Sequence, residues 1–132
     1  MSTFYNKQFA EDWGFLENEG EVSRKPTNCD GIVERRGKFM FLEVKRGEAT
    51  SEGQRRMLVA LAKQPGWTVL VVHSRRHPAD EFNARLVDPI AYEVFNPDGS
   101  KDAFNTNATD FKAKYFQWWS IQDRNVWLGQ PN

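Results

Sequence analysis

Residues 30–45 read D-G-I-V-E-R-R-G-K-F-M-F-L-E-V-K, and this stretch decides the fold. It predicts a tight β-hairpin with strands at about 29–36 and 39–46. The two-residue turn would be Arg36-Gly37, because glycine readily supplies the positive φ that such a turn needs. A turn centred there pairs positions whose numbers sum to 73, which fixes the register of the two strands.

That register places Asp30 directly opposite Glu43. Opposed residues project from the same face of a sheet, and the two-residue period of a strand adds Lys45 to that face. Phe39 and Phe41 lie in the same row of side chains, so Glu43 and Lys45 end a row that is otherwise apolar. Solubility does not explain charged residues in that position. Two carboxylates and an ammonium are therefore expected to converge beside a strand end, which is a layout suited to chemistry.

The residues after the hairpin predict a helix and then a buried strand. Ser51 and Gln54 have the spacing of a capping box, which would open an amphipathic helix over residues 51–64. The run W-T-V-L-V-V at 67–72 is continuously apolar, as in a strand buried on both faces. The order strand–helix–strand implies a parallel crossover onto the same sheet, and hence an α/β domain.

Elsewhere the periodicity is less regular, and five further features are expected. They are a helix at 4–18, a charged loop at 73–84, an edge strand at 85–96 interrupted by Pro89, a turn at 97–99, and a helix at about 109–122 that Thr109 or Asp110 would cap. The last helix presents an aromatic face that includes Trp118 and Trp119, which we expect in the core or at a dimer interface. The tail from Arg124 would be irregular.

The bulk composition is that of one ordinary domain. The chain has 132 residues, of which 39% are hydrophobic, so it can bury a proper core. One cysteine rules out an internal disulfide framework and favours a reducing compartment. No apolar run approaches membrane-spanning length, and the N-terminus lacks a signal-peptide pattern. We therefore expect a soluble cytoplasmic protein with no membrane partner.

The charge is balanced overall but unevenly distributed. Residues 34–76 carry ten Lys and Arg against four acids, although the net charge of the whole chain is zero. A basic middle between acidic flanks suits a localised surface that binds a polyanion. Five arginines are proposed as phosphate contacts; the alternative is that they are ordinary solvated surface residues. They are Arg35, Arg36, Arg46, Arg55 and Arg56.

Metal-dependent phosphodiester cleavage needs hard oxygen ligands for Mg²⁺ and a cation near the developing charge. Asp30 and Glu43 supply carboxylates, and the backbone carbonyl of Val44 adds a third oxygen. Lys45 is placed to orient or help deprotonate an attacking water and to stabilise charge on the phosphorane. Gln54 lies on the inner face of the predicted helix and can reach the site, unless it is only the reciprocal member of the capping box.

The sequence resembles the PD-(D/E)XK nuclease superfamily. The resemblance is carried by C-D-G-I-V at 29–33, F-L-E-V-K-R at 41–46 and S-E-G-Q-R-R-M-L at 51–58, followed by the apolar strand. It spans about residues 28–74, and within the superfamily it is closest to small VRR-NUC-like and archaeal Holliday-junction-resolvase-like modules, which are common in phages.

The resemblance implies a restriction-endonuclease-like fold, a mixed sheet flanked by helices. It also implies that the acids matching Asp30 and Glu43 bind Mg²⁺, that Mn²⁺ can substitute, and that the lysine matching Lys45 is catalytic. A glutamine on the next helix of the family matches Gln54.

Two departures from the family pattern bear on the metal site. Cys29 stands where a proline usually precedes the first acid. The family often has a further acid on its first helix, for which Asp12 is the first choice here and Glu17 the second, since both border the apolar face while Glu11 points away.

The expected function is that of a metal-dependent DNA endonuclease, in phage or prophage DNA processing or recombination within a bacterial host. A single site cuts one strand, so cleavage of a duplex or a junction would require a homodimer. The alternative is a non-catalytic member of the fold that binds DNA or a protein, such as an inhibitor of a host defence system.

Overall fold

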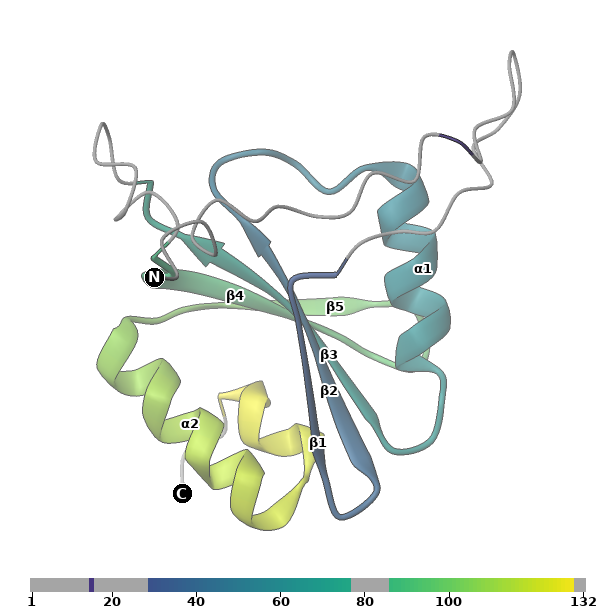
Figure 1. Ribbon diagram of the computed structural model, residues 1–132, viewed down its shortest axis with the longest axis vertical. Coiled ribbons are helices and arrows are strands. Elements are labelled where there is room, and N and C mark those ends of the chain that lie inside the picture. Colours follow the sequence, from purple (N-terminus) through teal and green to yellow (C-terminus); the bar gives the residue numbers. More distant parts are fainter. Residues whose placement is uncertain (1–14, 16–28, 77–85, 130–132) are drawn as a thin grey trace.

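The computed structural model describes Phe15 and residues 29–76 and 86–129. These residues form an α/β domain with one mixed five-stranded sheet in the order β1-β2-β3-β4-β5 (Figure 1). The predicted first helix at 4–18 lies outside the described residues, apart from Phe15. In the part of the chain that the structure describes, no helix has the length and apolar character needed to cross a membrane.

The predicted hairpin is confirmed by β1 (Gly31–Arg35) and β2 (Lys38–Lys45), which pair antiparallel in the expected register. Ile32 lies opposite Phe41, for example. Arg36 and Gly37 both have positive φ, of 54° and 80°, as a type I′ turn requires. This turn matches the right-handed twist of the two strands, so local chemistry sets the register on which the site depends.

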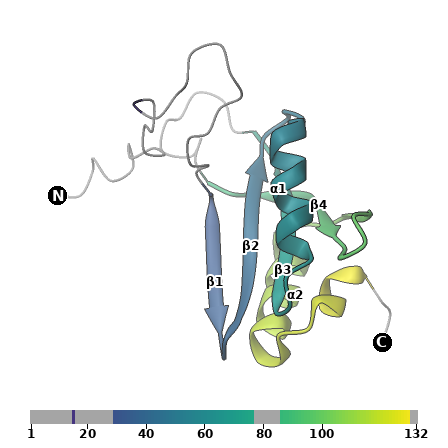
Figure 2. The same cartoon turned by 90° about the vertical axis from the view of Figure 1, so that its right-hand side faces the viewer.

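The crossover after the hairpin is also confirmed. A capping box at Ser51 begins α1 (Glu52–Ala62). The next strand, β3 (Trp67–Ser74), runs parallel to β2 and pairs with it from Trp67, opposite Phe39, to His73, opposite Lys45. Because β2 and β3 are parallel, their carboxyl ends lie at one end of the sheet, where α1 begins (Figure 2). We refer to this as the upper end of the sheet.

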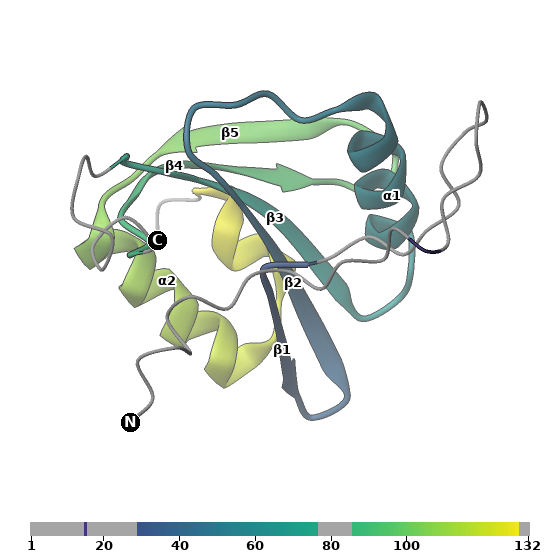
Figure 3. The ribbon, with the colours of Figure 1, turned by 45° about the horizontal axis from the view of Figure 1, so that its top comes forward.

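The second half of the sheet departs from the predictions. The strand expected at the sheet edge is β4 (Pro89–Phe95), which lies between β3 and β5 (Lys101–Asn105), so the prediction of an edge strand is wrong. Pro89 is tolerated because it is the first residue of β4, where the β3–β4 register also shifts. The predicted turn at 97–99 is confirmed and joins β4 to β5 as a second hairpin. The five strands together form a twisted sheet (Figure 3).

The C-terminal part packs as a helix followed by a 3₁₀ turn. The N-cap of α2 (Ala108–Ile121) is Asn107, whose side chain accepts a hydrogen bond from the Asp110 N–H, so neither predicted cap residue is right. The tail predicted to be irregular contains η4 (Arg124–Leu128), a 3₁₀ helix that buries Val126 and Trp127.

The two faces of the sheet carry two separate cores, one under each α-helix (Figures 1 and 2). Alternation along β2 divides them: Phe41 packs with Leu58 of α1, whereas Met40 packs with Trp118 of α2 on the other face. Trp118 is fully buried and its indole N–H donates to Thr68 Oγ1 at 3.2 Å, which settles it as core. Burial also raises the pKa of Tyr92 to about 12, and its phenol donates a hydrogen bond to the Trp127 carbonyl at 2.7 Å.

A matched pair of glycine variants tests the hairpin turn. Gly37→Ala introduces a Cβ into open space but at a φ of +80°, so we expect a loss of about 1–2 kcal/mol in the free energy of unfolding. Gly53→Ala lies in the first turn of α1, also with nothing near its Cβ, and we expect a gain of up to about 1 kcal/mol. Urea denaturation of both variants measures the difference, and equal effects would contradict the turn assignment.

Candidate active site

Glu43 and Lys45 end β2 on the face that α1 covers, and both side chains are nearly withdrawn from water. Their exposed fractions are 7% and 6%, values unusual for charged residues without partners. They follow Phe41 in the same row, so the apolar packing under α1 continues into this polar pair. The sequence prediction that the two charges share the face of Phe39 and Phe41 is confirmed.

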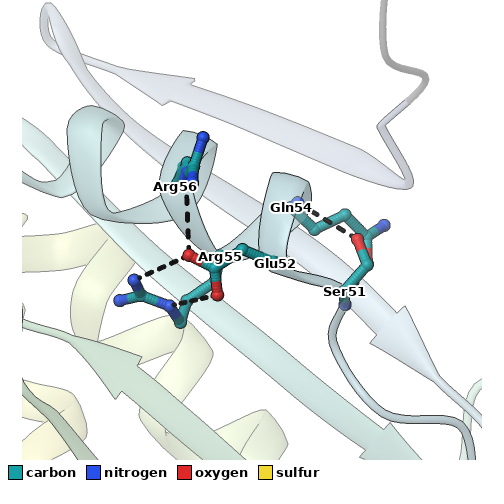
Figure 4. A network of polar contacts seen from close by, with 5 residues as sticks. All are labelled: Ser51, Glu52, Gln54, Arg55 and Arg56. Carbon is teal, nitrogen blue, oxygen red and sulfur yellow. Dashed lines mark hydrogen bonds and ion pairs between the residues drawn. The ribbon is translucent and has the colours of Figure 1, made fainter. Parts of the chain in front are cut away.

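Gln54 joins the two charged side chains. Lys45 Nζ donates to Gln54 Oε1 at 2.6 Å, and Gln54 Nε2 donates to Glu43 Oε2 at 3.1 Å. The capping box places this side chain at the start of α1, where Ser51 Oγ accepts from the Gln54 N–H at 3.2 Å (Figure 4). Gln54 is thus both a capping residue and part of the site, so the two roles weighed from the sequence are compatible.

The electrostatics of Glu43 are unfavourable to its charged form. Burial raises the pKa of its carboxyl above the ordinary value, the nearby charge of Asp30 raises it further, and Lys45 and the hydrogen bond from Gln54 only partly offset this. Its second oxygen, Oε1, is buried and has no hydrogen-bond partner among the described residues. A buried, unsatisfied carboxylate oxygen is costly, and a bound cation would satisfy it.

Asp30 directly precedes β1 and lies at the same end of the sheet. Its Oδ2 accepts a hydrogen bond from the Val44 N–H at 2.7 Å, so the backbone of β2 holds one carboxylate oxygen in place. The negative charge of Asp30 disfavours ionisation of Glu43 and so raises the pKa of the Glu43 carboxyl. The paired register begins at Gly31 opposite Leu42, so the predicted position of Asp30 directly opposite Glu43 lies one residue beyond the paired strands, and Asp30 contacts the backbone of Val44 instead.

The donor set fits a hard divalent cation. Mg²⁺ in proteins is commonly held by one or two carboxylates, with waters and substrate phosphates completing its shell, and Asp30 with Glu43 provides such a pair. The carbonyl of Val44, between the two charged residues of β2, remains a predicted third ligand. No group of three or more His, Cys, Asp or Glu side chains arranged for a metal occurs within the described ranges. Asp12, Glu17 and Glu11, the candidates for a further acid, lie outside those ranges.

The five predicted phosphate-contacting arginines are spread over the molecule. Arg35 and Arg36 lie at the hairpin turn, about 20–25 Å along the strands from Lys45, where Arg35 stacks on Trp119 and Arg36 donates to the Ser120 carbonyl. They support the packing of α2 at the lower end of the sheet.

The other three arginines lie nearer the site. Arg46 directly follows Lys45 and its carbonyl accepts two hydrogen bonds from Arg76, at 2.6 and 3.2 Å. Arg55 and Arg56 follow Gln54 on the exposed side of α1, where both converge on Glu52 at 3.1–3.3 Å (Figure 4). Arg46 and Arg76 therefore lie beside the carboxyl end of β2, whereas Arg55 and Arg56 are engaged with Glu52 on the outer side of α1.

A cluster of titratable side chains next to the site, on β3, β4 and β5, was not predicted from the sequence. His73 is the register partner of Lys45, and its Nε2 lies 3.2 Å from Glu93 Oε1, while Lys101 Nζ lies 2.9 Å from Glu93 Oε2. The parallel pairing of β3 with β2 was predicted, but the predicted strand ended at residue 72, and His73 was assigned to a loop. Extending that strand by one residue would have placed His73 beside Lys45.

A groove of about 510 Å³ lies at the other end of the sheet, lined in part by Lys38, Trp67 and Arg124. Among the described residues that line it, Asp123 is the one acid, so these residues offer no pair of carboxylates for a metal. The chemistry of the upper end is thus not repeated there.

No protein-family model matches this chain, and no curated protein or solved structure matches it either. The function is therefore inferred from the geometry around Glu43, Lys45 and Gln54.

Glu43→Gln tests the strain at the site through protein stability. A raised pKa in the folded state means that folding disfavours the ionised carboxyl, so stability falls as pH rises from the ordinary Glu range through the raised pKa. We expect the neutral variant to be more stable than the wild type by about 0.5–2 kcal/mol at pH 7 and to lose this advantage near pH 4.

Glu48→Gln is the control of opposite sign. Hydrogen bonds from the backbone N–H groups of Glu48 itself and of Arg46 lower the pKa of Glu48, so its carboxylate stabilises the fold at neutral pH and its removal should lower the melting temperature. Melting temperatures measured from pH 4 to 8 separate the two; a destabilised Glu43→Gln at pH 7 would contradict the stated electrostatics.

Proposed function

We propose that this chain is a metal-dependent deoxyribonuclease with a PD-(D/E)XK-type site on a restriction-endonuclease-like fold. The observation that carries the proposal is the buried bridge of Gln54 between Glu43 and Lys45, with Asp30 beside it. Acids alone would repel a phosphate group, whereas acids that hold a divalent cation would attract it. The unsatisfied Oε1 of Glu43 supports the presence of such a cation.

Each side chain then has a distinct task in the hydrolysis of a phosphodiester. Asp30 and Glu43 would hold Mg²⁺ or Mn²⁺, which supplies charge neutralisation at the phosphate and a more acidic bound water. Lys45, oriented by Gln54, would stabilise the negative charge that develops on the phosphorane oxygens. Because Lys45 is buried, its charge acts through a medium of low polarity and is screened less than a surface lysine.

The substrate proposed is DNA, bound across the upper end of the sheet. Arg46, Arg75 and Arg76 follow β2 and β3 at this end and would contact phosphates that flank the scissile one. One site of this kind cuts one strand, so cleavage of both strands of a duplex or junction would require two copies. Phage or prophage DNA processing, recombination or interference with host defence are roles compatible with this activity.

Metal binding can be measured without any substrate. Addition of Mg²⁺ or Mn²⁺ should raise the melting temperature, by the equivalent of about 1.4 kcal/mol at ten times the dissociation constant. Asp30→Asn and Glu43→Gln should abolish the increase, because each removes a ligand. Asp98→Asn, which removes a carboxylate hydrogen-bonded to Ser100 in the β4–β5 turn, should retain it. A shift that both ligand variants retain would place the metal elsewhere.

Nuclease activity is tested on supercoiled, linear and branched DNA, and on RNA, with Mg²⁺, Mn²⁺ or EDTA. We expect metal-dependent cleavage that Lys45→Ala slows at least about 100-fold, since removal of one group that stabilises the transition state has an effect of this size. Lys38→Ala changes the exposed lysine at the other end of β2 and should cut at the wild-type rate.

The possible results separate the proposal from its alternative. Cleavage that survives EDTA or Lys45→Ala would point to a contaminant or another site. Absence of cleavage on every substrate, together with DNA binding in a gel-shift assay, would identify a non-catalytic DNA-binding protein.

A further inference from the structure

The polar row of the site continues from β2 onto β3. Lys45 pairs with His73 in the parallel register, and Glu43 pairs with Val71, which is buried under α1. Since alternate residues of a strand share a face, His73 projects from the same face as Val71, Glu43 and Lys45. A histidine is thus placed one strand away from the lysine of the proposed site.

Glu93 holds this histidine from the next strand. Its Oε1 lies 3.2 Å from His73 Nε2, and its Oε2 lies 2.9 Å from Lys101 Nζ on β5. The side chain of Glu93 is 15% exposed, whereas His73 is 34% exposed and so accessible to a ligand. Burial opposes ionisation of Glu93, but the hydrogen bonds from Lys101 and His73 prevail and lower its pKa, so the carboxyl is a carboxylate at neutral pH.

The carboxylate determines which imidazole nitrogen carries the proton. An ionised carboxylate only accepts hydrogen bonds, so Nε2 of His73 must be the N–H, and the neutral ring then has its lone pair on Nδ1. A histidine held in one tautomer by a carboxylate is a common proton acceptor in enzymes. His73 is therefore held with Nδ1 as its basic nitrogen, on the strand next to Lys45.

Lys45 is less suited to that task. It is an ammonium that donates to Gln54 and lies beside Glu43, and a charged ammonium has three donors and no acceptor. The charged groups that face His73 from the adjoining strands are Lys45 on β2 and Glu93 on β4, with Lys101 of β5 behind Glu93.

We propose that His73 is a further catalytic residue, which accepts the proton of the attacking water, and that Glu93 and Lys101 are its positioning residues. This inference rests on the proposed nuclease function. The water oxygen forms a bond to phosphorus while its proton passes to Nδ1 of His73. The bond from phosphorus to the leaving oxygen breaks, and that oxygen keeps the electron pair and takes a proton from solvent.

The first test is chemical rescue. We expect His73→Ala to lower kcat about 10²–10⁴-fold with little change in KM, and free imidazole to restore part of the rate. His73→Gln, which keeps the volume of the side chain but has no basic nitrogen, should be equally slow, and Glu93→Gln should lie between it and the wild type. Imidazole should not restore Lys45→Ala, and Lys38→Ala should cut normally.

The second test needs no activity. ¹H–¹⁵N correlation spectra of the histidine rings in the full chain should show His73, identified by its loss in His73→Gln, as the Nε2–H tautomer. Glu93→Gln should convert it to a mixture of tautomers.

Rescue by imidazole together with the Nε2–H tautomer would support the inference. Wild-type rates in both His73 variants, or a loss that imidazole does not restore, would overturn it while leaving the nuclease function intact. A wild-type protein that cuts no substrate would instead overturn both.

Discussion

The position of Gln54 is the constraint on which the upper end of the molecule depends. Burial of Lys45 and Glu43 requires a neighbour that can accept from one and donate to the other, and a single amide does both. Hydrogen bonds to charged groups contribute about 1.5–3 kcal/mol each, and a buried charge that loses its partner costs about 3–5 kcal/mol. Since Ser51 fixes Gln54 at the third position of α1, the helix start and the site are set together.

The two packed faces of the sheet give this polar pair its surroundings. Phe41, two residues before Glu43, and Val71, beside Glu43 on β3, pack with α1. Met40 and Val72 pack under α2 on the opposite face, so β2 is held on both sides. A strand fixed in this way has little freedom to carry its last residues into solvent. The same packing that stabilises the fold therefore raises the pKa of Glu43 and leaves its Oε1 unsatisfied, a local cost typical of functional sites.

The parts that sequence could predict are those governed by local chemistry. The turn at Gly37 set the hairpin register, and the capping box at Ser51 set the start of α1. The strand β5 was missed because K-D-A-F-N has little apolar periodicity and takes its pairing from β4. His73 with Glu93 was missed because their meeting depends on the register between β3 and β4, which no local signal specifies.

The charges around Asp30 and Glu43 favour the proposed bound cation. Glu43 and Asp30 repel each other, and either would weaken the binding of a phosphate backbone to the basic groups at Arg46 and Arg76. A surface that only bound DNA would be more stable and bind more tightly with neutral residues at these two positions. The proposed divalent ion would reverse both effects, because it would satisfy the carboxylates and attract phosphate. The proposed site would thus be balanced electrostatically only as a ternary arrangement of acids, metal and phosphate.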